Sequence, residues 1–556
     1  MEPVDPAHDV DVLVIGAGFG GLCALHELRA AGRRAVVLER ADGVGGTWQW
    51  NRYPGARCDI ESVEYSYSFS KEVEDEWTWT EVLPAQPEIE RYLNFVADRL
   101  DLRRDIRFGT TVRAMTWDAV AAVWLVETVT DTDTVTETET GTGAGERWRA
   151  PFVVAATGIL SAPLTPDIPG VETFAGTTLF TSTYPPDGVD LTGRRVGIVG
   201  TGSSGVQATP VVAAQAAHLH VFQRSAAYTL PSNARPFEPG EFEELRSRYD
   251  EIREAQRASF VGAARLSAFS VLAATGRRPS LKDATREDQL QAIDERGVMG
   301  ALMWRDVLFD LDANRMATAL YGEAVARIVH DPRTAAALVP TYPFGCKRPI
   351  IDQGYYETFN RENVTLVDLR AAPIVEVTPA GIRTEDATYD LDVIIWATGF
   401  DAITGALDRI DIRGRDGALL RDVWASDGPG SYLGLAVAGF PNLFMIQGPA
   451  SPAATANYVT AAEHQVGWIV DCLSHLGAHE RRSIEAQPAA QLAWMEHTAS
   501  IVEGTIVLDP TCHSWWNGAN VPGKARRFLS YSAGAPEHRR RCDEVAADGY
   551  RGFVLA

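Results

Sequence analysis

Cysteines, long apolar runs and basic residues are all scarce in this chain, and each scarcity excludes a class of protein. The six cysteines are scattered through 556 residues without a C-x-x-C pair. That distribution predicts neither a disulfide framework nor a zinc site and is typical of a reducing cytoplasm. No stretch free of Gly and Pro reaches the ~18 apolar residues that a membrane-spanning helix needs. No secretory apolar segment precedes the first expected strand.

The shortage of basic residues leaves a formal net charge of −23. Such a charge argues against nucleic acid and anionic membranes as partners. An anionic cofactor would have to be held by local positive groups against this overall field. We therefore expect a cytoplasmic protein that acts on small molecules, and the composition specifies no oligomeric state. A chain of 556 residues is also too long for one core, so two or three domains are expected.

A dinucleotide-binding pattern begins near the N-terminus. The apolar segment 10–15 has the look of a buried parallel strand, and G-x-G-x-x-G follows at 16–21. An Ala/Leu-rich helix is expected next, and then a second strand at 35–38 that ends at Glu39. An acid about 20 residues after the glycines is placed to bind ribose hydroxyls. A glycine-rich turn without nucleotide is the alternative, but strand, helix and acid together favour the nucleotide.

Each glycine of this loop has its own expected role. Gly16 makes the tight turn, Gly18 lets the backbone approach a pyrophosphate, and Gly21 permits close packing of helix on strand. The helix N-terminus attracts the phosphates.

A second loop of the same kind follows a short apolar strand near residue 200, with Gly200, Gly202 and Gly205 in the glycine positions. The next strand, 219–222, leads into Arg224 in place of an acid. A carboxylate there would repel a 2′-phosphate, whereas arginine can pair with it through two hydrogen bonds. The second site therefore predicts NADPH, with a solvated surface charge as the alternative for Arg224. Two nucleotide sites in one chain indicate a flavin and a nicotinamide that work together.

Two similar strand ends, Ala155-Ala156-Thr157-Gly158 and Trp396-Ala397-Thr398-Gly399, suggest where the chain leaves and re-enters the first domain. The predicted fold class is α/β, with two Rossmann-like dinucleotide-binding domains (FAD and NADP), the second inserted in the first, and a helical subdomain. The expected boundaries are 1–160 and 392–556 for the FAD domain, 161–391 for the NADP domain, and about 236–338 for the helical insertion. The Thr/Asp/Glu/Gly tract 130–145 is expected to be a solvated hairpin tip.

Several long strings identify a family: 45–59, 199–205, 342–348, 397–400 and 514–524. Through them the chain resembles the type I Baeyer–Villiger monooxygenases over nearly its whole length. The resemblance implies FAD and NADPH as cofactors, and a small-molecule ketone and O2 as substrates. It implies that one oxygen atom is inserted next to the ketone carbonyl through a C4a-peroxyflavin, which gives an ester or lactone.

The resemblance also implies roles for individual residues. Arg348 matches the catalytic arginine, a permanent cation that stabilises negative charge, and Asp59 matches the acid that holds it in place. Cys58 and Cys346 lie beside these positions and receive no redox role. The cofactor-binding positions implied are Gly16, Gly18, Phe19, Gly21, Glu39, Gly46, Thr47, Trp48, Asp59, Tyr65, Val112, Gly200, Thr201, Gly202, Ser203, Ser204, Gln207, Arg224, Ser225, Lys347 and Trp515. The substrate loop implied comprises Pro452, Ala453, Ala454, Thr455 and Tyr458, and no metal is expected.

One position departs from the family. Its signature has the form F-x-G-x-x-x-H-x-x-x-W/Y-P, and in the matching segment 174–185 the histidine is replaced by Phe180. The change removes a hydrogen-bonding, titratable ring from the linker between the nucleotide domains. We therefore expect an altered coupling between NADPH binding and domain movement, with a redundant position as the alternative.

Three other functions stay open at this point. A flavin monooxygenase that oxygenates nitrogen or sulfur would depend less on Arg348. A disulfide reductase would need a C-x₄-C pair, and Cys58 stands alone. A flavoprotein that oxidises NADPH without an oxygenated product is the third.

Overall fold

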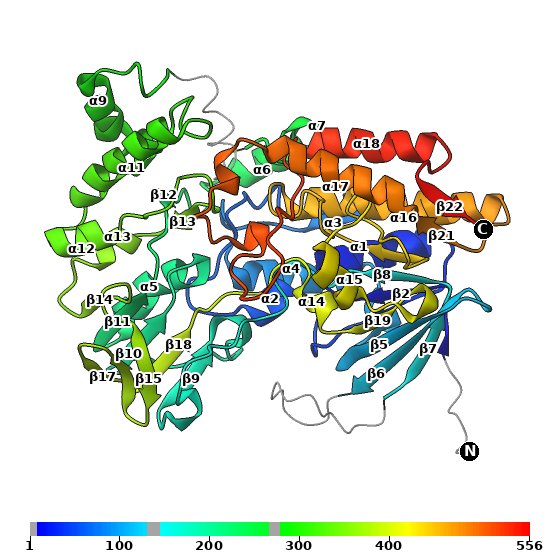
Figure 1. Cartoon of the computed structure of the whole chain (residues 1–556), viewed down its shortest axis with the longest axis horizontal. Helices are drawn as coiled ribbons and strands as arrows, with labels where there is room; N and C mark the ends of the chain where they lie inside the picture. Colours follow the sequence, from blue (N-terminus) through cyan, green and yellow to red (C-terminus); the bar gives the residue numbers. More distant parts are fainter. Residues whose placement is uncertain (1–7, 131–144, 266–278) are drawn as a thin grey trace.

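The computed structural model describes residues 8–130, 145–265 and 279–556, and its first layer is a parallel sheet (Figure 1). The strand order is β20-β8-β2-β3-β4, and every pair is parallel. The strands are β2 (Val12–Ile15), β3 (Ala35–Leu38), β4 (Ile106–Arg107), β8 (Phe152–Ala155) and β20 (Leu443–Met445). The predicted strand before the first glycine loop is confirmed, since all four residues of β2 are buried. Helix α1 (Phe19–Ala30) follows the loop and packs beside α16 (Tyr458–Ala478).

A mixed sheet with the order β1-β7-β6-β5-β19 covers one face of this parallel sheet. Its strands are β1 (His8–Asp9), β5 (Thr110–Asp118), β6 (Val123–Thr130), β7 (Arg147–Ala150) and β19 (Asp411–Arg413). Leu13 and Ile15 of β2 share an apolar cluster with Trp124 and Trp148 of this sheet. The acidic hairpin tip expected after β6 lies outside the described residues except at its two ends.

The second glycine loop belongs to a separate parallel sheet, called the second sheet below, with the order β14-β11-β10-β18-β9. Its strands are β9 (Thr177–Phe180), β10 (Arg195–Val199), β11 (His218–Gln223), β14 (Val364–Asp368) and β18 (Val393–Trp396). Helix α5 (Ser203–Gln215) follows β10 and packs on this sheet. A small antiparallel sheet adjoins it, formed by β15 (Ile374–Thr378), β16 (Gly381–Thr384) and β17 (Thr388–Asp390).

The expected return to the first domain at residue 392 falls directly before β18. Strand β18 pairs along its length with β10, from Val196↔Val393 to Val199↔Trp396, and therefore belongs to the second sheet. Its fully buried run Val-Ile-Ile-Trp fits a central parallel strand, and apolar character alone does not say which of two parallel sheets it joins. The chain leaves this sheet only after Trp396.

The helical insertion divides between the two cores. Helices α6 (Glu241–Ser247) and α7 (Tyr249–Ala258) contribute Phe242, Tyr249 and Ile252 to the large apolar cluster around α1. The later helices join the cluster of the second sheet, and α9 and α11 lie at the upper left of Figure 1. They are α9 (Arg286–Arg296), α10 (Val298–Leu302), α11 (Leu311–Ala326) and α12 (Pro332–Ala337).

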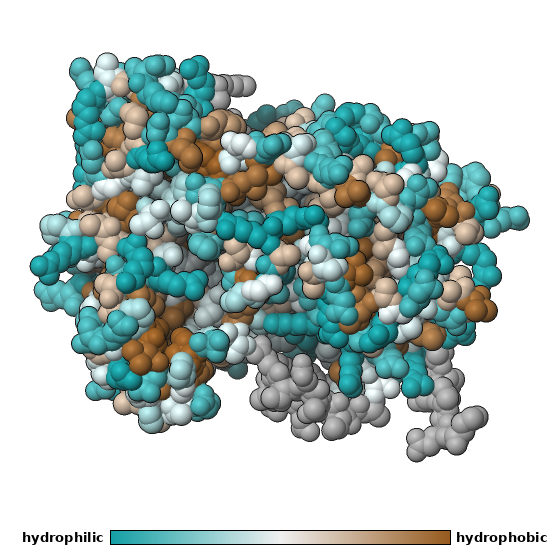
Figure 2. Space-filling model, in the orientation of Figure 1, coloured by the Kyte–Doolittle hydropathy of each residue, from teal (hydrophilic) through white to brown (hydrophobic). Residues whose placement is uncertain are grey.

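The remaining elements connect these layers, and α17 and α18 lie above α16 in Figure 1. They are α2 (Thr47–Trp50), α3 (Lys71–Glu76), α4 (Gln86–Arg99), β12 (Thr229–Pro231), β13 (Ile350–Asp352), α13 (Tyr355–Thr358), α14 (Gly405–Asp408), α15 (Leu420–Asp427), β21 (Ile484–Ala486), α17 (Pro488–Val502), α18 (Ala535–Ala547) and β22 (Phe553–Leu555). Within the described ranges, no helix combines the length and the apolar character that crossing a bilayer requires. Polar and apolar residues are interspersed over the face drawn in Figure 2.

Candidate active site

The first glycine loop is packed so tightly that it accepts no side chains. A β-carbon at Gly21 would lie 1.8 Å from the carbonyl oxygen of Gly16, and one at Gly16 would lie 2.6 Å from that of Ala156. Gly16 also has a φ of +101°, which L side chains rarely adopt. Gly18 faces Gly46, where a β-carbon would come within 3.0 Å of the Gly18 Cα atom. This bare backbone next to the start of α1 fits a dinucleotide pyrophosphate.

Glu39 lies at the end of β3 beside this loop. Its side chain is buried and accepts hydrogen bonds from the backbone N–H groups of Ala17 at 2.6 Å and Ala41 at 2.7 Å. Burial raises the pKa of this carboxyl, and the two backbone N–H groups oppose the rise. The acid is therefore held in one orientation against the glycine loop, as ribose recognition requires.

Most of the other predicted flavin positions lie together. Thr47 begins α2 directly after Gly46. The indole Nε1 of Trp48 donates to the hydroxyl of Tyr65 at 3.1 Å, and the Tyr65 ring lies 5.0 Å from that of Phe19 between centroids. Val112 differs, since it lies in β5 and its side chain is buried in the core between the first parallel sheet and the mixed sheet.

Arg348 and Asp59 form the central ion pair of the site, although 289 positions separate them in the sequence. Arg348 Nε donates to Asp59 Oδ2 at 3.0 Å, and Arg348 Nη2 contacts both carboxylate oxygens. The side chains are 25% and 17% exposed. A fork held at both ends fixes the position of the guanidinium. The pair also joins a loop of the first domain to the segment that leads into β13.

The cysteine prediction is wrong for one pair. Cys346 and Cys512 form a disulfide with their Cα atoms 5.8 Å apart and 166 positions between them in sequence. The remaining four cysteines are free and buried, and burial raises the pKa of the Cys58 thiol well above its usual range. Sequence spacing gave no signal because the two segments meet only in the folded chain. The bond links the segment of Arg348 to the loop of Trp515.

We expect four free thiols per chain when the denatured protein is titrated without reductant, and six after reduction. Cys512→Ser should lower the free energy of unfolding by up to about 5 kcal/mol, because the cross-link closes a long loop. Cys472→Ser is the matched control, since it removes a buried free thiol and no cross-link. Six thiols without reductant would contradict the bond.

The second glycine loop repeats the packing of the first. Gly200 has a φ of +114°, and a β-carbon there would lie 2.4 Å from the carbonyl oxygen of Ala397. A β-carbon at Gly205 would lie 2.0 Å from the oxygen of Gly200. Gly202 has no atom within 4 Å of its β-carbon position, and α5 begins directly after it at Ser203. Backbone and helix N-terminus are thus open for a second dinucleotide.

Gln207 of α5 connects the two nucleotide regions. Its Oε1 accepts a hydrogen bond from the hydroxyl of Tyr53 at 2.8 Å, and its Nε2 donates to the carbonyl oxygen of Arg57 at 3.1 Å. Burial raises the pKa of Tyr53 to about 12, although Ser204 hydrogen bonds with it. A β-carbon at Gly55 would lie 2.4 Å from the Gln207 carbonyl oxygen. The predicted cofactor position Gln207 therefore has its amide bound to the first domain.

Three predicted phosphate contacts gather at the end of β11. Burial, and then the positive charge of Arg224, lowers the pKa of Lys347 to about 8. The Lys347 Nζ atom lies 4.3 Å from the ring centroid of Tyr342, and Arg224 is exposed. Among the described residues, neither cation has a carboxylate within 4 Å. Thr201 Oγ1 donates to the carbonyl oxygen of Ser225 at 2.7 Å, which ties the glycine loop to this cluster.

The predicted substrate loop lies against the C-terminal segment. Ala454 is buried in an apolar cluster that Trp515 packs against. Pro452 and Ala453 are buried as well, and Thr455 Oγ1 donates to a main-chain oxygen of the C-terminal segment at 2.7 Å. The hydroxyl of Tyr458 would lie 3.2 Å from a β-carbon at Gly20, so this ring faces α1.

The loop of Trp515 is fastened on its other side to the end of β18. Lys524 Nζ pairs with Asp401, and their side chains are 11% and 19% exposed. Asn520 Nδ2 donates to the carbonyl oxygen of Phe400 at 2.9 Å. The disulfide and these contacts together define the position of the loop.

Phe180 occupies the position of the signature histidine at the end of β9. Its partner in the sheet is Trp396, and the ring packs against the apolar cluster of the second sheet. The apolar ring of Phe180 thus replaces the polar ring of the signature histidine. It lies beside Trp396, the last residue of β18.

Two acids that follow Asp59 contact the segment after α7. This contact was not predicted from the sequence. Glu64 accepts the backbone N–H of Ala264 at 2.6 Å, and Glu61 pairs with Arg265. Burial raises the pKa of Glu64 to about 7. Only the unusual density of acids in this segment could have indicated such a contact.

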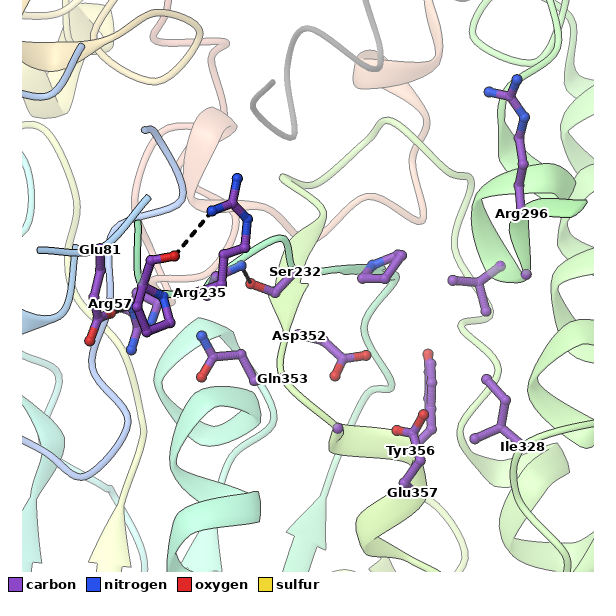
Figure 3. A pocket seen from close by; sticks show the side chains of 16 residues that line it. Arg57, Glu81, Ser232, Arg235, Arg296, Ile328, Asp352, Gln353, Tyr356 and Glu357 are labelled. Atoms are coloured by element: carbon purple, nitrogen blue, oxygen red, sulfur yellow. Dashed lines mark hydrogen bonds and ion pairs between the residues drawn. The ribbon is translucent and has the colours of Figure 1, made fainter. Parts of the chain in front are cut away.

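A separate cavity of about 510 Å³ lies beside this site, between the two nucleotide regions and α9–α10 (Figure 3). Arg57 pairs with Glu81, and Arg235 pairs with Glu241. Figure 3 shows Arg57 and Glu81 at one side of the cavity and Arg296 at the other. Its charges are largely compensated, and neither Arg348 nor Asp59 lines it.

Comparison with known proteins agrees with this architecture. The family model described as pyridine nucleotide-disulphide oxidoreductase matches residues 10–300, which defines the class of the chain. A 2-oxo-Δ3-4,5,5-trimethylcyclopentenylacetyl-CoA monooxygenase of Pseudomonas putida is 38% identical, with 98% of both chains covered. A Baeyer–Villiger monooxygenase of Pseudooceanicola batsensis is 39% identical, with 98% of this chain and 96% of the relative covered. The phenazine N-monooxygenase PhzNO1 of Lysobacter antibioticus is 37% identical, with 98% and 97% covered.

Solved structures give the same result. An oxidised steroid monooxygenase bound to NADP has a TM-score of 0.87 and 42% identity, with 98% of this chain and 99% of that chain covered. The OTEMO complex with FAD and NADP has a TM-score of 0.88 and 36% identity, with 99% and 100% covered. The chain belongs to the Baeyer–Villiger monooxygenases, the FAD- and NADPH-dependent family that its sequence resembles.

Proposed function

We propose that this chain converts a small-molecule ketone into an ester or lactone, with Arg348 as the fixed cation of the reaction centre. The observation that carries this proposal is the two-point ion pair of Arg348 with Asp59, which bridges segments of both nucleotide regions. Oxygen insertion next to a carbonyl places negative charge on the substrate oxygen. A preorganised guanidinium beside that oxygen stabilises the charge without a proton transfer.

The glycine loops and the charged side chains beside them fit both cofactors. The loop of Gly16, Gly18 and Gly46 and the buried Glu39 would hold FAD, and the open Gly202 with Arg224 and Lys347 would hold NADPH. Bound together, FAD and NADPH supply the hydride and oxygen-transfer chemistry.

The protein supplies position and charge around these cofactors. Asp59 orients the guanidinium of Arg348, and the contact of Gln207 with Tyr53 sets the approach of the two nucleotide regions. Trp515 and the loop around Ala454 close the site from the C-terminal side.

We infer a division into domains from the sheets. The FAD domain would comprise 1–160 and 397–556, and the NADP domain 161–396 with the helical insertion 236–338. With this division, all strands of the first parallel sheet lie in the FAD domain, and all strands of the second lie in the NADP domain.

Oxygenation of nitrogen is the second candidate, because one relative of 37% identity is named a phenazine N-monooxygenase. That chemistry needs an electrophilic oxygen donor and develops no oxyanion on the substrate. It would therefore depend little on Arg348.

Product analysis distinguishes the two candidates. The holoenzyme is supplied with NADPH, air and a panel of acetone, cyclopentanone, cyclohexanone, a thioether and phenazine. We expect ester or lactone in proportion to the NADPH consumed for at least one ketone. Oxygenated nitrogen or sulfur products without any ester would contradict the proposal.

The pH dependence of NADPH binding tests the role of Lys347. Its pKa is lowered to about 8 in the free protein, and a bound 2′-phosphate would favour the charged form. The KM for NADPH should therefore be lowest below pH 8 and rise as the pH increases through 8. Lys347→Arg should remove this rise, because arginine stays protonated. A parent profile that is flat between pH 7 and 9.5 would exclude a contact of Lys347 with the phosphate.

A further inference from the structure

The disulfide between Cys346 and Cys512 joins two loops that both carry predicted site residues. Cys346 lies two positions before Arg348, and Cys512 lies three positions before Trp515. Neither cysteine belongs to a helix or a strand. One covalent bond therefore fixes the segment of Arg348 to the loop of Trp515, defined here as residues 509–530.

The loop of Trp515 borders several parts of the site. The Trp515 ring packs against the apolar cluster that contains Ala454 of the predicted substrate loop. It also packs against a second small cluster, which contains Ala402 and Ile403 and which Leu160 joins from its edge. These residues follow the two strand ends at which the chain passes between the proposed domains. A change in the position of this loop would therefore reach the substrate loop and both domain crossings.

Each of the two loops has hydrogen bonds of its own that do not depend on the disulfide. The carbonyl oxygen of Cys512 accepts a hydrogen bond from Arg526 Nη2 at 2.9 Å. The turn before Cys346 is held by Asn314, whose side-chain amide bonds to the N–H and to the carbonyl oxygen of Phe344, both at 2.9 Å. Opening the disulfide should therefore free the loops from each other without unfolding either of them.

The surroundings allow this bond to react and keep the other thiols inert. Both cysteines of the bond are buried, but Thr511 and His513, on either side of Cys512, are exposed. A reagent can thus reach the bond through a local opening of one surface loop. Burial raises the pKa of each of the four free cysteines, so almost none of their reactive thiolate form exists at neutral pH.

We propose that the Cys346–Cys512 pair is a reversible redox site that controls how tightly the enzyme holds its nicotinamide cofactor. In the oxidising direction, two thiols and one hydrogen peroxide give the disulfide and two water molecules. A turnover in which O2 takes two electrons from NADPH without oxygenating a ketone supplies this peroxide. In the reducing direction, a dithiol attacks the bond, becomes a disulfide itself and leaves the pair as two thiols.

The bond acts on cofactor affinity through both loops. Lys347, which directly follows Cys346, and Trp515 are predicted cofactor contacts, so this effect rests on the proposed function. With the bond closed, the segments that carry the two contacts are already fastened together before the cofactor binds. With the bond open, binding must order one loop against the other. The reduced form should therefore bind the cofactor about 3–10-fold more weakly.

Two redox states of one holoenzyme test this site. The FAD-loaded protein is treated with reduced or with oxidised dithiothreitol and desalted, and the thiols of a denatured portion are counted. We expect six thiols after reduction and four after oxidation. The Kd of NADP⁺ should be about 3–10-fold higher for the reduced form. Trypsin should cleave that form faster after the exposed Arg526, because its loop is less constrained.

Hydrogen peroxide added to the reduced form should restore four thiols and the lower Kd. Cys512→Ser and Cys346→Ser should show the weaker binding and the faster cleavage after either treatment, because no bond can form. Cys472→Ser is the matched control, since it removes a buried free thiol and should respond as the parent does.

Equal Kd values and equal cleavage rates for the two states of the parent would overturn the proposal. Four thiols after both treatments would overturn it as well, because the bond would then be purely structural. Absence of NADP⁺ binding in both states would instead contradict the proposed cofactor site. The cleavage rates would then decide whether the pair controls the loop.

Discussion

Replacing Arg348 by alanine is expected to reduce ester formation by at least about 10²–10³-fold, the usual cost of removing a preorganised donor to an oxyanion. Flavin binding should persist, because the glycine loop and Glu39 lie on other elements. The measurement is kcat for ester formation together with the FAD content of the purified variant. NADPH should still be oxidised, so the ratio of ester to NADPH consumed should fall as well.

Arg348→Lys and Asp59→Asn separate charge from geometry. Lysine keeps the charge but loses the planar fork, so we expect poor ester formation from this variant as well. Asp59→Asn leaves the arginine in place and removes the two-point contact that orients it. Ester formation at the parental rate by Arg348→Ala would exclude the catalytic role.

Arg224→Ala should raise the KM for NADPH by about 10–100-fold, since hydrogen bonds to charged groups contribute ~1.5–3 kcal/mol each. The KM for NADH should change little, because NADH has no 2′-phosphate. The expected result is therefore a loss of cofactor preference. Steady-state kinetics with both cofactors measures it directly.

Arg194→Ala is the control for charge alone. Arg194 directly precedes the N-terminal end of β10, whereas Arg224 follows the carboxyl end of the parallel strand β11. It should leave both KM values near those of the parent. An equal rise of both KM values in Arg224→Ala would contradict recognition of the 2′-phosphate.

The parts of the fold that sequence could predict depend on short-range rules. The strand at 35–38 is confirmed as β3, because an apolar β-branched run beside a glycine loop has few alternatives. The tight turns at Gly16 and Gly200 are confirmed by their positive φ angles. The residues proposed to carry the chemistry were identifiable through long strings shared with the family, since neither Arg348 nor Asp59 follows from periodicity.

The parts that could not be predicted depend on contacts between distant segments. Strand β18 joins the second sheet through pairing with β10. The residues of an apolar strand do not by themselves specify which strand it pairs with. The bond between Cys346 and Cys512 and the contact of Gln207 with Tyr53 have the same origin. In each case the fold brings together segments that sequence spacing treats as independent.

Isotope incorporation from ¹⁸O₂ is the most direct test of the central claim. The holoenzyme and NADPH are incubated under labelled oxygen with each ketone of the panel, and the products are analysed by mass spectrometry. We expect an ester or lactone from at least one ketone, with a mass equal to that of the ketone plus one ¹⁸O atom. Unlabelled ketone recovered with hydrogen peroxide in proportion to the NADPH consumed, across the whole ketone panel, would contradict it.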